Sequence, residues 1–309
     1  MTALHLAGIV KRYGSTTALS GLTLDVDAGE MFGLIGPDGA GKSTAIRLMC
    51  GLLHPDAGEI RVLGLDPTRD HRGVTERVGY LSQRFSLYGD LTIDENIAFF
   101  AEVHGVPRYH RRRDQLLEMT QLTPFRRRLA DRLSGGMKQK LALACTLVHE
   151  PALILLDEPT TGVDPVSRRE FWKLLSEFLA QGITILMSTP YMDEAERCGR
   201  VALLHEGRVL AADTPDRLRQ TIRGRMLEVV VARAGETADV VRQVPGVLDA
   251  QVFGDRLHVT LDNDAGPEAI DRFRAALQAR GVAEASVRPV TPSLEDVFIA
   301  QLARKEQAA

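Results

Sequence analysis

The sequence is poor in cysteine and has no CxxC pair. Its three cysteines, Cys50, Cys145 and Cys198, are isolated along the chain, a pattern typical of reduced thiols in a cytosol and not of a disulfide scaffold. Long apolar runs are also missing, since a stretch such as Ile183–Met187 falls far short of the roughly 18 residues that a membrane-spanning helix needs. The N-terminal segment places its basic residues after its apolar ones, unlike a secretory signal. These absences predict a cytoplasmic protein that cannot cross a membrane alone.

Excess charge of one sign is lacking as well. Lysine and arginine number 38 against 41 aspartates and glutamates, a formal net charge of −3. Nucleic-acid-binding proteins use a positive excess to displace counterions, so we expect no nucleic acid among the partners. Aromatic residues are only 5% of the chain, but hydrophobic residues reach 44%. A length of 309 residues therefore favours about two globular domains with at least one large core.

Short, continuous apolar runs are the main secondary-structure signal. Such runs predict strands buried on both faces, at Met31–Ile35, Arg77–Leu81, Ala152–Glu158, Ile183–Thr189 and Arg200–His205. Helical patterns separate them, so the sequence predicts an α/β fold with a mainly parallel sheet covered by helices. At the start of the chain, alternating segments at Leu4–Val10 and Leu22–Val26 predict antiparallel strands.

Two further regions interrupt this pattern. Thr92–Val103 and Tyr109–Leu122 are helical by spacing, which predicts an inserted helical subdomain at about 88–150. After a polar linker at Asp213–Arg225, strands and helices alternate again and predict a small C-terminal α+β domain. Its last helix is expected to begin with Thr291 as N-cap and Pro292 as the first helical residue. We therefore expect domains at 1–220 and 221–309.

A glycine-rich loop between a strand and a helix is the clearest chemical motif. It fits G-x-x-x-x-G-K-[ST] and consists of Gly36, Pro37, Asp38, Gly39, Ala40, Gly41, Lys42, Ser43 and Thr44. The glycines let backbone N–H groups surround phosphate oxygens at the positive end of the following helix. Lys42 would reach the β and γ phosphates, and the Ser43 hydroxyl would bind Mg²⁺.

Two carboxylates end a later buried strand. Asp157 and Glu158 follow the run LILL at the carboxyl edge of the expected sheet, where open α/β sheets bind ligands. Asp157 could hold Mg²⁺, and Glu158 could orient or deprotonate an attacking water. Read alone, the pair could also be a strand end that faces solvent.

The segment LSGGMKQK contains a second possible phosphate contact. Ser134 is a candidate N-cap, and Gly135 and Gly136 leave the first turn of the helix without side chains. Exposed N–H groups at such a helix start can approach a phosphate closely. In isolation, an ordinary capped helix explains this segment equally well.

Taken in order, these motifs resemble the ATP-binding cassette of ABC transporters over about residues 1–220. The resemblance implies a P-loop NTPase cassette with an antiparallel β subdomain and the inserted helical subdomain. It assigns the Walker A loop to Gly36–Ser43, the signature to Leu133–Met137 and Walker B to Asp157 and Glu158. It adds three positions, namely Tyr13 to stack on adenine, Gln83 in the Q-loop and Asp164 in the D-loop.

The resemblance also implies cofactors and catalytic roles. ATP and Mg²⁺ are the implied cofactors, with Glu158, Lys42 and Gln83 catalytic and Ser43, Gln83 and Asp157 at the metal. Without the family pattern, Tyr13 could equally be an aromatic residue of a surface turn. Gln83 could likewise be a polar loop residue.

The ending TPSLEDVFIAQL, Thr291–Leu302, is similar to the C-terminal extension of the drug-exporter branch. This similarity implies the ATP-hydrolysing subunit of an exporter, held at the inner face of the cell membrane by membrane-spanning permease subunits. A second cassette, identical or different, is the other implied partner. A soluble ABC ATPase without a transport role is the rival interpretation. Such proteins are similar to tandem cassettes or to cassettes split by long coiled coils, and this sequence shows neither pattern.

The chain departs from the family at three positions. Asp38 stands where asparagine is common, Met137 where glutamine is usual, and Pro190 where the family has its switch histidine. Proline has no side-chain donor for a γ-phosphate. A regulatory cassette with little turnover, paired with a complete partner, is therefore an alternative function.

Two arginine clusters in the helical subdomain have two possible roles. Arg111–Arg113 and Arg126–Arg128 could form an ordinary salt-bridged surface, or they could contact the membrane domain or anionic headgroups.

Overall fold

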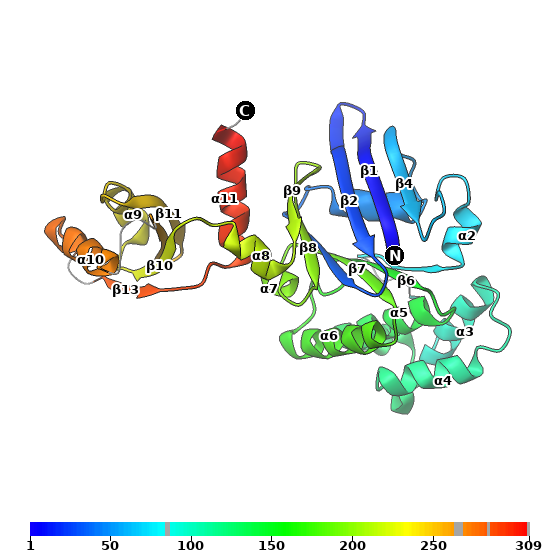
Figure 1. The fold of residues 1–309 in the computed structure, drawn as a ribbon. Helices are drawn as coiled ribbons and strands as arrows, with labels where there is room; N and C mark the ends of the chain where they lie inside the picture. The colour runs from blue at the N-terminus through cyan, green and yellow to red at the C-terminus, as the bar shows by residue number, and fades with distance from the viewer. Residues whose placement is uncertain (84–86, 263–267, 283–284, 308–309) are drawn as a thin grey trace. The chain divides into compact units, whose positions relative to one another are not determined.

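The computed structural model describes residues 1–83, 87–262, 268–282 and 285–307. The chain forms two compact units, Met1–Thr214 and Pro215–Ala309 (Figure 1). Within the described ranges, no helix has both the length and the apolar character to span a bilayer. The three cysteines are buried free thiols.

A six-stranded sheet forms the centre of the first unit. Its order is β5 (Val78–Leu81), β6 (Leu153–Asp157), β7 (Thr184–Thr189), β3 (Met31–Ile35), β8 (Arg200–His205) and β9 (Arg208–Asp213). Every neighbouring pair is parallel except β8 and β9. All residues of β3 and β6 are buried, as continuous apolar runs require. The predicted mainly parallel sheet is confirmed.

The order of these strands fixes where the motifs meet. Because β6, β7 and β3 are parallel neighbours, their carboxyl ends at Asp157, Thr189 and Ile35 lie along one edge of the sheet. The glycine-rich loop leaves β3 at this edge and leads into α1 (Lys42–Met49). The loop and the two carboxylates are thereby brought together.

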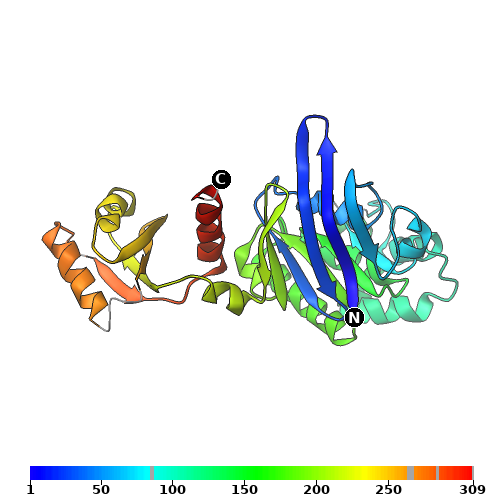
Figure 2. The same cartoon turned by 45° about the horizontal axis from the view of Figure 1, so that its top comes forward.

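An antiparallel sheet of order β2-β1-β4 lies beside the central sheet (Figures 1 and 2). It consists of β1 (Thr2–Tyr13), β2 (Thr16–Asp27) and β4 (Ala57–Val62). β1 and β2 are longer than the strands that the alternating apolar segments predict. Polar residues such as Lys11 and Arg12 continue the ladder to the turn, because backbone pairing needs no apolar side chain.

Helices complete the first unit. They are α2 (His71–Thr75), α3 (Ile93–Val103), α4 (His110–Met119), α5 (Gly135–Leu147), α6 (Pro165–Ala180) and α7 (Met192–Ala195), with short 3-10 turns at Thr123–Phe125 and Ala130–Arg132. Thr92 and Glu95 form a capping box at α3, which fixes where this helix begins. The predicted helical subdomain at about 88–150 contains α3, α4 and α5, which lie together in Figure 1.

Two histidines connect α3, α5 and the central sheet. His104 follows α3 and His149 lies just beyond α5, and their rings stack with centroids 3.8 Å apart and planes at 2°. The His149 Nε2 atom lies 3.3 Å from the Val78 carbonyl oxygen of β5. Burial and the neighbouring His104 lower the pKa of His149 from 6.5 to about 4.

This lowered pKa predicts that acid destabilises the protein. The unfolded chain protonates His149 as the pH falls below 6.5, whereas the folded chain does so only near pH 4, so stability present above pH 6.5 is lost across that window. We expect the melting temperature to fall by at least about 2 °C for each kcal/mol lost. His149→Phe, which keeps a stacking ring but cannot titrate, should weaken the dependence. An equal fall in both proteins would contradict the assignment.

The second unit contains an antiparallel sheet of order β11-β12-β10-β13. The strands are β10 (Arg225–Val230), β11 (Val247–Phe253), β12 (Arg256–Leu261) and β13 (Ser286–Pro289). The helices are α8 (Pro215–Gln220), α9 (Ala234–Arg242), α10 (Ala269–Ala279) and α11 (Leu294–Gln307). Residues of α9 and α10 share one apolar core with the sheet. The expected small α+β fold is present.

Two details of this unit differ from the sequence-based expectations. The expected linker contains α8, which packs with α11 and lies in the second unit, so the division at Thr214 precedes the expected boundary at 220. The last helix begins at Leu294 and not at Pro292. Ser293 and Asp296 form reciprocal side-chain to backbone hydrogen bonds at its start, and these cap the helix in place of Thr291.

Candidate functional site

The glycine-rich loop needs glycine for two different reasons. Gly41 has φ +105°, and a Cβ there would lie 2.6 Å from the Ala18 carbonyl oxygen. A Cβ on Gly36 would collide with the Leu204 carbonyl oxygen. At Gly39, with φ +79°, the Cβ position is open. The loop therefore turns tightly against the protein on one side and presents bare backbone on the other.

A cavity of about 280 Å³ lies against this loop. Its lining residues are Tyr13, Ala18, Gly39, Gly41, Lys42, Ser43, Thr44 and Glu158. Tyr13 reaches it from the end of β1 and is 46% exposed. Pro37 and Asp38 are exposed at the tip of the loop, whereas Ala40 is buried beneath it.

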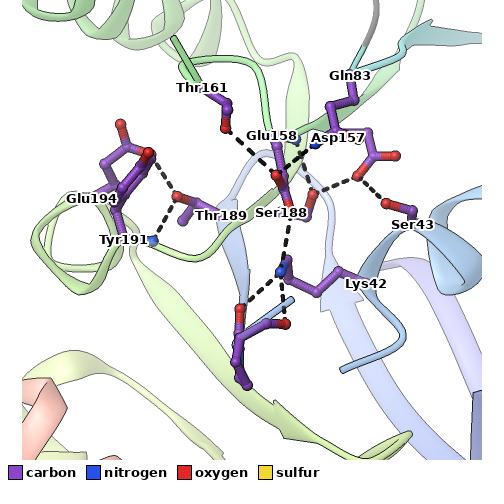
Figure 3. Close-up of polar contacts among 12 residues, drawn as sticks. Lys42, Ser43, Gln83, Asp157, Glu158, Thr161, Ser188, Thr189, Tyr191 and Glu194 are labelled. Atoms are coloured by element: carbon purple, nitrogen blue, oxygen red, sulfur yellow. Dashed lines mark hydrogen bonds and ion pairs between the residues drawn. The ribbon is translucent and has the colours of Figure 1, made fainter. Parts of the chain in front are cut away.

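Lys42 is almost completely buried and points into the loop. Its ammonium donates to the carbonyl oxygens of Gly36 at 2.8 Å and Pro37 at 3.0 Å. It also lies 3.1 Å from Glu158 Oε1 (Figure 3). A phosphate that enters the cavity must therefore compete with the Glu158 carboxylate for this ammonium.

Asp157 is bound by two hydroxyls. Ser43 Oγ and Ser188 Oγ donate to Asp157 Oδ1 at 2.9 and 2.8 Å, and the aspartate is 1% exposed. Ser43 comes from α1 and Asp157 from the end of β6, so the sheet edge brings the glycine-rich loop and the acidic pair together. The hydroxyl and the carboxylate are hard oxygen ligands of the kind that Mg²⁺ prefers.

Glu158 has the backbone conformation of a strained residue. Its φ is +47°, in the left-handed region that costs about 1–3 kcal/mol for a residue with a side chain. Its N–H donates to Ser188 Oγ at 3.0 Å, which helps hold this conformation. Carboxylate Oε2 accepts from Gln83 Nε2 at 3.0 Å and from Thr161 Oγ1 at 3.5 Å. Gln83 is thus brought to the same cluster.

The segment expected to be the signature begins α5, as predicted. Ser134 is its N-cap, with Oγ accepting from the Met137 N–H at 3.3 Å. Gly135 faces open space, but a Cβ on Gly136 would collide with Ser167 of α6. The second glycine is therefore needed for packing between α5 and α6.

Asp164 is the N-cap of α6. Its carboxylate accepts from the N–H groups of Val166 and Ser167 at 3.0 Å, and the hydrogen bonds from Ser167 lower its pKa. Among the described residues, the cavity lining includes neither Asp164 nor Ser134–Gly136. The expected binding residues therefore form two groups, one around the cavity and one at the starts of α5 and α6.

Sequence reasoning missed Ser188, Thr161 and Glu194. Ser188 contacts Asp157 at the end of β6, and Thr161 contacts Glu158. Glu194 contacts the hydroxyl of Thr189 beside Pro190. Single serines, threonines and glutamates have no distinguishing spacing, so only their contacts in the folded chain identify them. The pairing of β7 with β6 brings Ser188 beside Asp157.

One arginine of each cluster, Arg113 and Arg126, forms close ion pairs with neighbouring aspartates. Arg126 Nε lies 2.8 Å from Asp94, and Arg126 and Arg113 both contact Asp114 at 3.1 Å. These pairs favour the interpretation of a salt-bridged surface.

Comparison with known proteins identifies the class of protein. The ABC transporter family model matches residues 19–161, and the model of the DrrA1-3-like ATP-binding protein C-terminal domain matches residues 214–302. The chain belongs to the family of ABC transporter ATP-binding proteins, and the resemblance to its drug-exporter branch is confirmed.

Individual relatives are similar over nearly the whole chain. Daunorubicin resistance ATP-binding protein DrrA3 of Streptomyces coeruleorubidus is 37% identical, with 96% of this chain and 95% of that protein covered. Probable multidrug ABC transporter ATP-binding protein YbhF of Escherichia coli (strain K12) is 42% identical over 95% of this chain. The chain spans only 51% of that relative's length.

Solved structures match the cassette. The structure of an ATP binding subunit of an ABC transporter superimposes with a TM-score of 0.65 and 34% identity, covering 71% of this chain and 93% of that one. The structure of cbiO1 from Clostridium perfringens also gives a TM-score of 0.65, at 29% identity and over 70% of this chain and 90% of that one. The predicted P-loop NTPase fold is confirmed.

Proposed function

We propose that this chain binds ATP with Mg²⁺, hydrolyses it to ADP and phosphate, and thereby powers export through separate membrane-spanning permease subunits. The observation that carries the proposal is that Lys42, Ser43 and Glu158 line one cavity beside a bare glycine loop, with Asp157 hydrogen-bonded to Ser43. Tyr13 at the rim is suited to stack on the base.

The residues present fit a bound Mg²⁺. The Ser43 hydroxyl and the Asp157 carboxylate, 2.9 Å apart, would hold it, and Gln83 is the third expected ligand. When bound, the ion would neutralise part of the charge on the phosphates. Lys42 would add a second positive charge from the loop side and leave Glu158 free to act.

Glu158 is proposed as the general base. Its carboxylate takes a proton from water while the water oxygen attacks the γ-phosphorus, and the bond to the bridging oxygen of ADP breaks. Gln83 and Thr161, which both contact Glu158 Oε2, would orient the carboxylate toward that water. ADP and inorganic phosphate are then the products.

A second cassette would complete the site. Ser134–Gly136 and Asp164 do not line the cavity of their own chain, so we propose that they contact the ATP held by a partner cassette. Permease subunits would hold the pair at the inner face of the membrane. Because the named relatives include drug and Nod factor exporters, an exported small molecule is the proposed cargo class. Recovery of the chain from membranes only when a permease is co-expressed would support this part.

Pro190 favours one alternative, a regulatory cassette with little turnover. The ring is half-buried directly after Thr189 and offers no donor to a γ-phosphate. Pro190→His should raise the ATP turnover of the purified chain by at least about 30-fold, since one donor stabilises the transition state by about 2 kcal/mol or more.

The control is Pro190→Ala, which removes the ring without adding a donor. Measurable wild-type turnover supports the hydrolytic function, and its absence with ATP still bound supports the regulatory one. Equal turnover of the histidine and alanine variants would mean that another group already supplies the donor. The interpretation of Pro190 as a deficient position would then be wrong.

A further inference from the structure

A buried carboxylate outside the cavity joins three segments of the first unit. Glu194 of α7 is 1% exposed, and both of its oxygens are bound. Thr160 Oγ1 donates to Oε1 at 2.6 Å. Thr189 Oγ1 donates to Oε2 at 2.7 Å (Figure 3). Arg168 of α6 lies 3.6 Å from Oε1. Loss of one of these partners would leave a buried charge without compensation, which costs free energy of folding.

The first two contacts lead to the catalytic edge. Thr160 lies two residues after Glu158, whose left-handed backbone must be held by its surroundings. Thr189 follows Ser188 on β7, and successive strand residues point to opposite sides. Ser188 therefore binds the acidic pair while Thr189 binds Glu194.

The third contact leads to the opposite group of binding residues. Arg168 lies one turn into α6, which Asp164 caps and whose Ser167 packs against Gly136. The Arg168 guanidinium lies 4.9 Å from the centre of the Tyr191 ring, and the Tyr191 N–H donates to Thr189 Oγ1. Glu194 thus connects the end of β7 with the start of α6.

We propose that Glu194 is a positioning residue that transmits nucleotide binding at the Glu158 edge to α6, and hence to the residues offered to the partner cassette. The inference rests on the proposed ATP hydrolysis. A phosphate that draws Lys42 away from Glu158 alters the contacts of the Glu158–Thr160 segment, and Glu194 couples that change to Arg168.

The sequence provides a natural probe, because Trp172 is the single tryptophan. It lies on α6, one turn after Arg168, and is 3% exposed. In the full chain, Mg-ATP should change its fluorescence. Glu194→Gln should abolish most of that change and lower kcat about ten-fold with KM and ATP affinity unchanged, the scale of a lost hydrogen bond to a charged group.

Matched variants separate positioning from folding. Asp193→Asn, an exposed carboxylate one residue away, should leave the response and kcat at wild-type values. Thr189→Val should lose the fluorescence response and lower kcat as Glu194→Gln does. Thr189→Ser keeps the hydroxyl and should therefore keep the wild-type response and kcat. If Glu194→Gln does not fold, Thr160→Val and Thr189→Val provide the same comparison.

The outcomes are distinct from those for the proposed function. A wild-type chain that neither binds nor hydrolyses ATP overturns both proposals. A chain that hydrolyses ATP while Glu194→Gln keeps the full fluorescence response and kcat overturns the role of Glu194 alone. Parallel loss of affinity, kcat and stability without rescue by Thr189→Ser means that Glu194 only supports folding.

Discussion

Replacing Glu158 with glutamine is expected to lower ATP hydrolysis by about 10² or more while ATP binding persists, the scale of a lost general base. The amide keeps the size of a side chain that is 7% exposed and already surrounded by Lys42, Gln83 and Thr161. It removes the negative charge that competes with phosphate for Lys42. Affinity for ATP should therefore be equal to that of the wild type or higher, and a dimer closed over ATP should persist.

The measurement is phosphate release in a single turnover, together with binding of a fluorescent ATP analogue. Glu177→Gln, a partly exposed carboxylate on α6, is the matched control and should hydrolyse ATP at the wild-type rate. Normal turnover of Glu158→Gln would show that a different group takes the proton from water. Loss of both binding and turnover would instead indicate a collapsed site.

Apolar runs and the phosphate loop were sufficient to predict the centre of the fold. Met31–Ile35 forms β3 as expected, because a strand buried on both faces must be apolar throughout. The Asp157–Glu158 pair could be located for the same reason, since it ends the run that forms β6. Lys42 and Ser43 followed from a motif whose spacing is fixed by backbone geometry.

The contacts between motifs could not be predicted in this way. Ser188 meets Asp157 through the register of β7 against β6, and Glu194 of α7 meets Thr160 and Thr189 only in the folded chain. The last helix begins at Leu294 and not at Pro292 because Ser293 and Asp296 form reciprocal hydrogen bonds at its start. Tertiary pairing therefore supplies what local patterns lack.

Lys42→Ala is the change expected to weaken ATP binding most. The ammonium now donates to two loop carbonyls and contacts Glu158, and it is 4% exposed. Hydrogen bonds to charged groups contribute about 1.5–3 kcal/mol each, so we expect ATP affinity to fall by about 10- to 100-fold or more. Lys173→Ala, an exposed lysine on α6, is the control and should bind ATP like the wild type.

The ion pair also predicts an effect on stability that can be separated from binding. Without Lys42, the Glu158 carboxylate remains buried and uncompensated, and breaking a buried pair costs about 3–5 kcal/mol. Lys42→Ala alone should therefore lower the melting temperature. Adding Glu158→Gln removes the buried charge, so the double variant should recover much of the lost stability but none of the lost ATP affinity. Recovery of both would mean that Lys42 acts on ATP only by neutralising Glu158, and the assignment of its ammonium to the phosphates would be wrong.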